Sequence, residues 1–339
     1  MKRLFFLLYL LAFCQVLAQP WTHTYKCVFS EEKMHANRTK SELLILQANS
    51  LPFTQLIFSW NAFRPERGKF SFFLRIRDQE TQQWDQWHKI LEWGAQIQKS
   101  FFNRGTHSYF NYARLEMNTG KKGDAFQLKV IPENQASLKG IKALMMTASD
   151  FSNFESEPYK ERGKGLRSCL VKNIPKKSQI MIDHPRAGAL CSPTSMSMVV
   201  EGLSEEKVDP LEFANFVYDE GLDAFGNWGF NMAHAFERTG STILFSTVRL
   251  NSFRDLHELL LKNIPVAVSV RGHIKGACKE YKNGHLLVVI GFDAQQDHVI
   301  CYDPAFDMPE EVEKRYNLHD FIVSWERSRR LTYKPEVID

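Results

Sequence analysis

The pattern of apolar residues changes half-way along this chain of 339 residues, and that change limits the folds open to it. Before residue 150, short segments rich in aromatic and β-branched residues alternate with polar residues between turns, as antiparallel strands do. These segments are residues 54–62, 69–77, 109–115 and 125–130. We therefore expect residues 19–150 to form an all-β domain, either a β-sandwich or a jelly roll.

The second half follows a polar stretch, residues 151–169, whose serine, glycine and proline content is typical of a linker. Helical signals come first, with a proline-led start at 209–210 and a capping pattern at 252–255. Strands follow, including the apolar run 286–290, which is typical of a strand buried on both faces. Helices before strands predict an α+β domain over residues 170–339.

The N-terminus has the charged, apolar and small-residue regions of a secretory signal. Lys2 and Arg3 precede the apolar stretch 4–13, and Ala18 precedes the expected cleavage site. We therefore expect a signal peptide over residues 1–18 and a secreted or periplasmic protein. No later segment is apolar for long enough to cross a bilayer, so we expect no transmembrane segment after the signal is removed.

Composition excludes two further classes of protein. With 44% hydrophobic and 13% aromatic residues, the chain is not an intrinsically disordered protein. The formal net charge of +4 falls by two charges when Lys2 and Arg3 leave with the signal. A charge so close to zero gives no electrostatic case for nucleic acid as a partner.

The number of cysteines points to a free thiol. Of six cysteines, Cys14 leaves with the signal, and an odd number remains in an exported chain. At least one thiol is therefore unpaired, and Cys191 is the candidate. The other four either form up to two disulfides or stay free and buried. They are Cys27, Cys169, Cys278 and Cys301.

Cys191 stands where a helix should begin, because Pro193 fits the first helical turn. A helix N-terminus carries roughly +0.5 elementary charge, which favours a thiolate over a thiol. Downstream, His285 leads the buried strand, and Asp303 ends the next strand, residues 298–302. If the two strands form a hairpin, Asp303 lies within a few residues of facing His285. The order predicts a thiol nucleophile, its base and the group that orients the base.

Three further residues complete the predicted site. Gln179 precedes the cysteine by twelve positions, and its amide can supply an oxyanion donor beside the Cys191 N–H. Trp228 and Asn227, in a glycine-flanked turn, are expected to contact the substrate at the cleft wall, although a buried tryptophan anchoring the turn fits equally well. Structural alternatives also stay open for Asp303, as a loop cap, and for the cysteine, as a core thiol.

Two other kinds of catalytic site lack the residues that they need. His257-Glu258 resembles the start of a zinc protease motif, but position 261 is leucine rather than the second histidine ligand. No Gly-x-Ser-x-Gly motif supports a serine hydrolase. No pair of cysteines has metal-site spacing either, so we expect no metal and no cofactor.

These residues resemble the papain-like cysteine peptidases related to the bacteriocin-leader-processing enzymes, family thirty-nine of the cysteine peptidases, in its stand-alone exported branch. The similarity spans about residues 170–310 and implies a papain-like fold for this half of the chain. It is carried by the motifs at 178–179, 191–195, 226–228, 230–231, 264–265, 284–285 and 303–304.

The resemblance implies Cys191 as the nucleophile and His285 as the general base. It likewise implies Asp303 as the orienting acid and Gln179 as the oxyanion glutamine. Residues 58–62 also resemble the β-domain that precedes the catalytic domain in some exported bacterial relatives. The bacteriocin-processing members are fused to a membrane transporter, whereas this chain has neither membrane spans nor a glycine-rich nucleotide loop, so leader processing is not implied.

We interpret the chain as an exported cysteine peptidase that cleaves peptide or amide bonds through a thioester on Cys191. Its partner is then a peptide or protein substrate, and a cell-wall component or glycan is a candidate ligand of the β-domain. Two alternatives stay open: a peptidoglycan amidase or acyl or peptidyl transferase with the same triad, and a non-catalytic surface protein that binds a glycan or a protein. The tryptophans from Trp84 to Trp93 fit either a sugar-stacking surface or a sandwich core.

Overall fold

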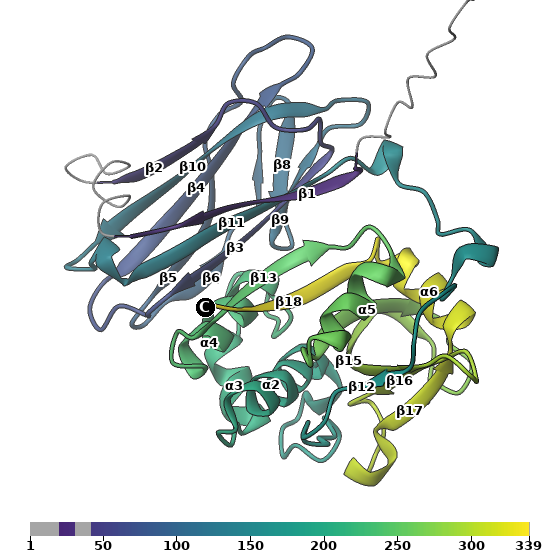
Figure 1. The fold of residues 1–339 in the computed structure, drawn as a ribbon. Coiled ribbons are helices and arrows are strands. Elements are labelled where there is room, and N and C mark those ends of the chain that lie inside the picture. The colour runs from purple at the N-terminus through teal and green to yellow at the C-terminus, as the bar shows by residue number, and fades with distance from the viewer. Residues whose placement is uncertain (1–19, 31–41, 339) are drawn as a thin grey trace, which may run out of the picture.

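The computed structural model describes residues 20–30 and 42–338. The expected signal peptide, residues 1–18, lies outside these residues. Within them, no helix is long and apolar enough to cross a membrane. Two antiparallel sheets form the first half, and helices surround a third sheet in the second half (Figure 1), in agreement with the expected α+β class.

The first half contains two sheets that face each other. In the described residues, the first sheet has the strand order β1 (Thr22–Val28), β11 (Ile141–Ser149), β3 (Gln55–Ala62), β9 (Arg114–Met117), β8 (Ser108–Asn111) and β7 (Asn103–Arg104). The second sheet has the order β2 (Leu43–Gln47), β10 (Gly123–Glu133), β4 (Lys69–Asp78), β5 (His88–Gly94) and β6 (Gln98–Ser100).

Aromatic rings fill the space between these two sheets. The ring of Trp60 on β3 lies 5.1 Å from that of Phe72 on β4 and 5.6 Å from that of Trp93 on β5. Trp93 is therefore a core residue, whereas Trp84 and Trp87 stay partly exposed. Of the two expected alternatives, Trp93 therefore fits the sandwich core, whereas Trp84 and Trp87 lie at the surface.

The structure corrects one expected strand. Residues 109–115 form parts of two strands, β8 and β9, because the chain reverses at Tyr112 and Ala113. Both residues have positive φ, 48° and 61°, which places a tight turn where the sequence has neither glycine nor proline. The alternation of apolar residues continues through the turn, so the pattern alone resembles one strand.

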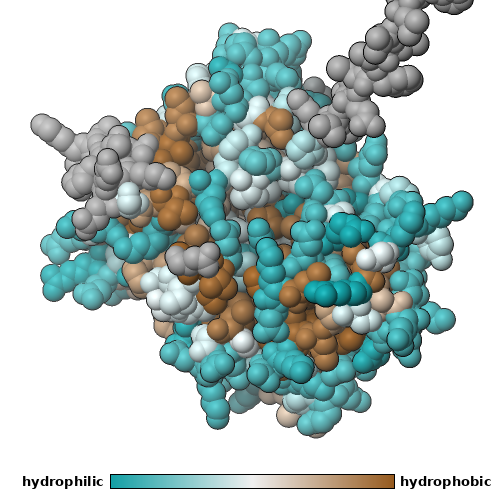
Figure 2. All heavy atoms as spheres, viewed as in Figure 1, coloured by the Kyte–Doolittle hydropathy of each residue, from teal (hydrophilic) through white to brown (hydrophobic). Residues whose placement is uncertain are grey.

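The edge strands β1 and β2 leave an opening at one side of the sandwich. A cavity of about 220 Å³ lies between them and is lined largely by apolar side chains, including Ile45, Phe126, Leu128, Leu144 and Met146. Hydrophobic surface shows at this side of the β-sheets in Figure 2. The interior of the sandwich is therefore accessible from its β1–β2 edge.

The second half is built on a third antiparallel sheet. Its order in the described residues is β13 (Ile243–Arg249), β18 (Leu331–Val337), β14 (Val266–Gly272), β15 (Tyr281–Asp293), β16 (His298–Tyr302) and β17 (Glu313–Asn317), with β12 (Cys169–Leu170) paired to β15. The helices are α2 (Cys191–Ser204), α3 (Pro210–Val217), α4 (Trp228–Arg238), α5 (Phe253–Leu261) and α6 (Leu318–Arg327). Short 3-10 turns lie at Leu138–Gly140, Phe151–Asn153, Tyr159–Glu161, Ala187–Ala189 and Pro309–Glu311.

The two halves share one hydrophobic core, and a series of hydrogen bonds along β13 also joins them. Asn61 on β3 donates Nδ2 to the Phe245 carbonyl at 2.9 Å and accepts the Phe245 N–H at 2.7 Å. Thr147 on β11 donates its hydroxyl to the Thr247 carbonyl at 2.9 Å. Because β13 is the edge strand of the third sheet, the β-half covers a strand edge that would otherwise be open.

Helix α4 also packs closely against the β-half. Helix α4 contacts β3, and β9 pairs with β3 only at residues 55–57 of that strand. A Cβ atom at Gly229, in the first turn of α4, would lie 2.5 Å from the Trp60 ring. Glycine therefore permits this approach of helix to strand, and the position of α4 depends on the β-half.

Candidate active site

Cys191 is the first residue of α2, and it is more exposed to solvent than the nine residues that follow it in the helix. The next nine residues, 192–200, are all buried, whereas Cys191 is partly exposed. Leu190 at the N-cap provides no side-chain cap, so no side chain competes with the sulfur for the N–H groups of the first turn. A helix N-terminus with an accessible thiol is the environment that activates a cysteine.

His285 lies on β15, where it pairs with Val270 of β14 and is buried. Gly284, just before it, has a φ of +92°, a backbone conformation that glycine adopts without strain. The imidazole stacks on the ring of Tyr281, with centroids 4.1 Å apart and planes inclined by 17°. The ring is therefore fixed by its own strand and by a neighbour on the same face of that strand.

Asp303 follows β16 and is fully buried. Its Oδ1 accepts a hydrogen bond from Nε2 of His285 at 2.7 Å and from the Ala305 N–H at 3.1 Å. Its Oδ2 accepts from the hydroxyls of Tyr281 at 2.6 Å and Tyr316 at 2.7 Å. Because Nε2 is bonded to Asp303, Nδ1 is the nitrogen left for the cysteine sulfur.

The charges around His285 favour an ion pair with Cys191. Burial opposes the charge on His285, but the Asp303 carboxylate outweighs it and raises the pKa of His285 to about 9. Burial also favours the neutral thiol of Cys191, but the hydrogen bond and charge of His285 outweigh it and lower the pKa of Cys191 below its usual range. The proton therefore prefers the imidazole, which leaves sulfur as the thiolate.

The remaining thiols differ from Cys191 in this respect. Cys169, Cys278 and Cys301 are free, like Cys191. Burial raises the pKa of each of these three thiols. Of these four cysteines, Cys191 alone has the electrostatic surroundings of a nucleophile.

Gln179 connects the two segments that carry Cys191 and Asp303. Its backbone N–H donates to the Pro304 carbonyl at 2.9 Å, directly after Asp303. Its Nε2 donates to the Ala187 carbonyl at 3.1 Å, in the turn just before Cys191. That bond uses one of the two amide protons, and the side chain is buried, so a second N–H remains for an oxyanion.

The structure gives Asn227 and Trp228 contacts with the scaffold. Asn227 caps α4 by accepting from the N–H groups of Gly229 and Phe230, at 3.1 and 3.3 Å. Its Nδ2 donates to Asp219 at 2.6 Å. The ring of Trp228 lies under the guanidinium of Arg114, 5.6 Å from its centroid, at the border with the β-half. Their expected contact with substrate stays a prediction, and the observed contacts are those of the alternative, a residue pair that anchors the turn.

Comparison with known proteins identifies the second half of the chain. Residues 171–333 match the model of the Peptidase_C39 like family. This half belongs to the peptidase C39-like family. The match confirms the resemblance inferred from the sequence and extends it beyond residue 310, so that it includes β17 and α6.

One solved structure similar to the chain is that of a proposed C39-like peptidase from Bacillus anthracis. It is 16% identical and covers 51% of this chain and 100% of its own, with a TM-score of 0.39. No curated protein matches the chain.

Two residues of the C39-like domain that sequence reasoning missed are Tyr281 and Tyr316, both bonded to Asp303. Tyr281 precedes His285 by four positions on one strand, so a period of two places both on the same face. That signal was available in the sequence. Tyr316 lies on β17, and its approach to Asp303 depends on the pairing of β16 with β17, which has no local signal.

Proposed function

We propose that this chain is a cysteine peptidase in which Cys191, His285 and Asp303 form the catalytic triad. The observation that carries the proposal is the position of His285. Its Nε2 is bonded to a fully buried carboxylate at 2.7 Å, and its charge lowers the pKa of the thiol at a helix N-terminus. A histidine positioned between a thiol nucleophile and an acid is the arrangement that hydrolysis by a catalytic cysteine requires.

The reaction follows from these protonation states. The Cys191 thiolate attacks the carbonyl carbon of the scissile bond, and the carbonyl oxygen becomes an oxyanion. The His285 imidazolium gives its proton to the departing amine as the C–N bond breaks, which leaves a thioester on sulfur. Neutral His285 then takes a proton from water, hydroxide attacks the thioester, and the thiolate leaves as the carboxylate product forms.

Two N–H donors support an oxyanion site beside Cys191. The backbone N–H of Cys191 lies in the first helical turn, where it has no intrahelical acceptor. The amide of Gln179 is anchored through Ala187 next to the same turn and keeps one N–H free. Loss of one such donor typically reduces kcat by about 10²–10³-fold.

We further propose that the protein is exported and that its first half is a jelly roll. Export is supported by the signal-like sequence of residues 1–18. The jelly roll is supported by repeated crossings of the chain between the two facing sheets: β1 and β3 lie in one sheet and β2 and β4 in the other, and β10 and β11 again lie in different sheets.

A peptide library prepared from a digested proteome tests the proposed activity without a known substrate. We expect the full chain to generate new peptide termini, identified by mass spectrometry, and Cys191→Ser to reduce their formation by about 10³-fold or more. Cys169→Ser changes another free thiol, on β12 where it pairs with Phe292, and serves as the matched control, with unchanged activity.

Three outcomes would contradict the proposal. They are the absence of new termini with the wild-type chain, equal cleavage by Cys191→Ser, and loss of cleavage in Cys169→Ser. An amine acceptor added to the reaction separates hydrolysis from transfer, because a transferase places the acyl group on the amine instead of on water.

A further inference from the structure

The outward face of the second β-sheet carries a row in which aromatic rings and cations alternate. The guanidinium of Arg75 lies 5.1 Å from the ring centroid of Trp84 and 4.6 Å from that of Trp87. The Nζ of Lys129 lies 4.5 Å from the centroid of Trp87 and 5.2 Å from that of Phe73. All five side chains are partly exposed, and the row is called the Trp84–Phe73 row below.

The row lies on the side of the sandwich away from the C39-like domain. Along β4, the side chains of Phe72, Leu74 and Ile76 are buried toward the first sheet, and the alternate residues point outward. The first sheet, in turn, contacts β13 and α4 through β3. The row is therefore separate from the proposed catalytic site by the thickness of the sandwich.

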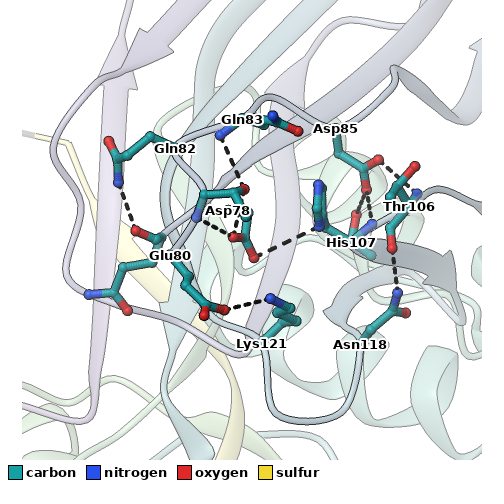
Figure 3. Close-up of polar contacts among 12 residues, drawn as sticks. Asp78, Glu80, Gln82, Gln83, Asp85, Thr106, His107, Asn118 and Lys121 are labelled. Carbon is teal, nitrogen blue, oxygen red and sulfur yellow. Dashed lines mark hydrogen bonds and ion pairs between the residues drawn. The ribbon is translucent and has the colours of Figure 1, made fainter.

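Buried polar residues hold the segment that carries the two tryptophans. The carboxylate of Asp85, between them in sequence, accepts from the N–H groups of Thr106 at 2.9 Å and His107 at 3.1 Å (Figure 3). It also accepts from the Ser108 hydroxyl at 2.7 Å, and Ser108 in turn bonds Nε2 of His88 at 2.9 Å. Trp84 and Trp87 are thus presented by a fixed loop, which lowers the entropy cost of binding.

Among the described residues, neither cation of the row has an acidic partner. Arg75 donates Nε to the Gln127 amide at 2.7 Å. Among the described contacts, neither of its terminal amino groups has a hydrogen-bond acceptor, and neither Arg75 nor Lys129 forms an ion pair. Two positive groups held against aromatic rings, with guanidinium N–H groups free, are suited to an anionic ligand with paired oxygens.

We propose that the Trp84–Phe73 row binds a carboxylated polysaccharide. The cations accept the carboxylates, and the Gln127 amide is placed to bond sugar hydroxyls. Trp84 and Phe73, at the ends of the row, each contact one cation and are partly exposed, so part of each ring is available to the apolar face of a sugar. The small net charge of the chain argues against nucleic acid, whose binding depends on many phosphate contacts.

Native gel electrophoresis of the full chain in gels that contain a polysaccharide tests this proposal. Polygalacturonate and hyaluronate are the carboxylated probes, and dextran is the neutral probe. We expect both carboxylated probes to retard the chain, dextran to leave its mobility unchanged, and added salt to weaken the retardation. Trp84→Ala leaves the charge unchanged and is expected to weaken binding about tenfold, as is Arg75→Gln.

Matched controls separate a built site from general charge. Arg67→Gln removes one positive charge elsewhere in the β-half, where the guanidinium contacts the Gln135 amide, and binding is expected within twofold of wild type. Trp84→Phe keeps a ring and is expected to keep most of the affinity, which excludes misfolding as the cause of the Trp84→Ala loss.

Four results would overturn the proposal. They are mobility unaffected by both carboxylated probes, equal retardation by dextran, equal losses in Arg67→Gln and Arg75→Gln, and binding confined to anionic phospholipid vesicles tested in parallel. None of these readouts depends on peptidase activity, so the proposal and the proposed function can fail separately.

Discussion

At the scale of single residues, the site depends on how Asp303 is kept ionised in a fully buried position. Burial favours the neutral acid, but His285 and then the hydroxyls of Tyr281 and Tyr316 outweigh it and lower the pKa of Asp303. With Ala305, four donors occupy the carboxylate. A charged acceptor with all its sites filled holds the imidazole in one tautomer and one orientation.

Removal of the Tyr281 hydroxyl tests this arrangement. Tyr281→Phe keeps the ring that stacks on His285 and removes one hydrogen bond to a charged acceptor, worth about 1.5–3 kcal/mol. We expect kcat to fall by about tenfold and KM to change little. Tyr112→Phe, which alters an exposed tyrosine at the β8–β9 turn, is the control, and equal losses in the two variants would contradict a role for the hydroxyl.

The pH dependence of thiol alkylation and of turnover gives a second test. Because the pKa of His285 is raised to about 9, the imidazolium needed to protonate the departing amine persists up to that pH and is lost above it. In Asp303→Asn the carboxylate is gone, so the alkaline limb of the kcat/KM profile is expected to move to lower pH, by about one unit or more.

The acid side of the same profile reports Cys191. Its lowered pKa predicts that iodoacetamide reacts at pH values where an ordinary thiol, with a pKa of about 8.5, is unreactive. Cys278, whose pKa is raised, should react only at higher pH. Identical alkylation profiles for the two cysteines would show that His285 does not stabilise the thiolate.

At the scale of elements, the proposed active site lies where the first turn of one helix, α2, packs against one strand, β15. The hydroxyl of Ser195, on the first turns of α2, donates to the Leu286 carbonyl on β15 at 3.0 Å. The Leu286 N–H is also a donor to the Cys191 sulfur. Leu286, the residue after His285, thus links β15 to the helix that begins with Cys191.

Gly284 precedes His285 on β15, so a change in its backbone conformation would move His285 relative to α2. Its φ of +92° is strained for any residue with a Cβ, at a cost of order 1–3 kcal/mol. We expect Gly284→Ala to lower the free energy of unfolding by this amount and to reduce kcat by shifting His285, as measured by chemical denaturation and steady-state kinetics. Gly226→Ala, at a glycine with open space around it, is the control and should change neither.

Local patterns located most elements because strands and caps are local in sequence. The capping pattern at 252–255 does cap α5, and the apolar run 286–290 does lie in β15. The turn at Tyr112 was missed because its positive φ values occur without a glycine. The proline-led start at 209–210 does begin α3, which ends at Val217, and the N–H of Glu220 donates to the Gln98 carbonyl of the β-half.

At the scale of the whole molecule, the sequence indicated two domains but not how they join. One side chain that joins them, Asn61, is 184 positions from its partner Phe245, and no periodicity or motif relates the two. The proximity of His285 to Asp303 was accessible because they flank a hairpin. The hydrogen bond between His285 and Cys191 joins elements that are far apart in sequence, so it was predicted only from the order of these residues and from the family resemblance.

A shared core and a covered strand edge predict that the two halves unfold together. Asn61→Leu has nearly the same volume but leaves the buried N–H and carbonyl of Phe245 without partners, at a cost of about 1–3 kcal/mol for each group. We expect one calorimetric transition in the wild type and a single, lowered transition in the variant. Hydrogen exchange should accelerate in β10 and in β14, one strand from each half.

Asn118→Leu provides the comparison for that experiment. Asn118 bonds the Thr106 carbonyl within the β-half on the exposed surface, so its loss should lower stability by no more than about 1 kcal/mol. Independent halves would give a different result: two transitions in the wild type, and faster exchange in Asn61→Leu confined to one half. Because β13 is the edge strand of the sheet that carries His285, loss of the polar contacts along β13 is also expected to lower kcat at temperatures well below the transition.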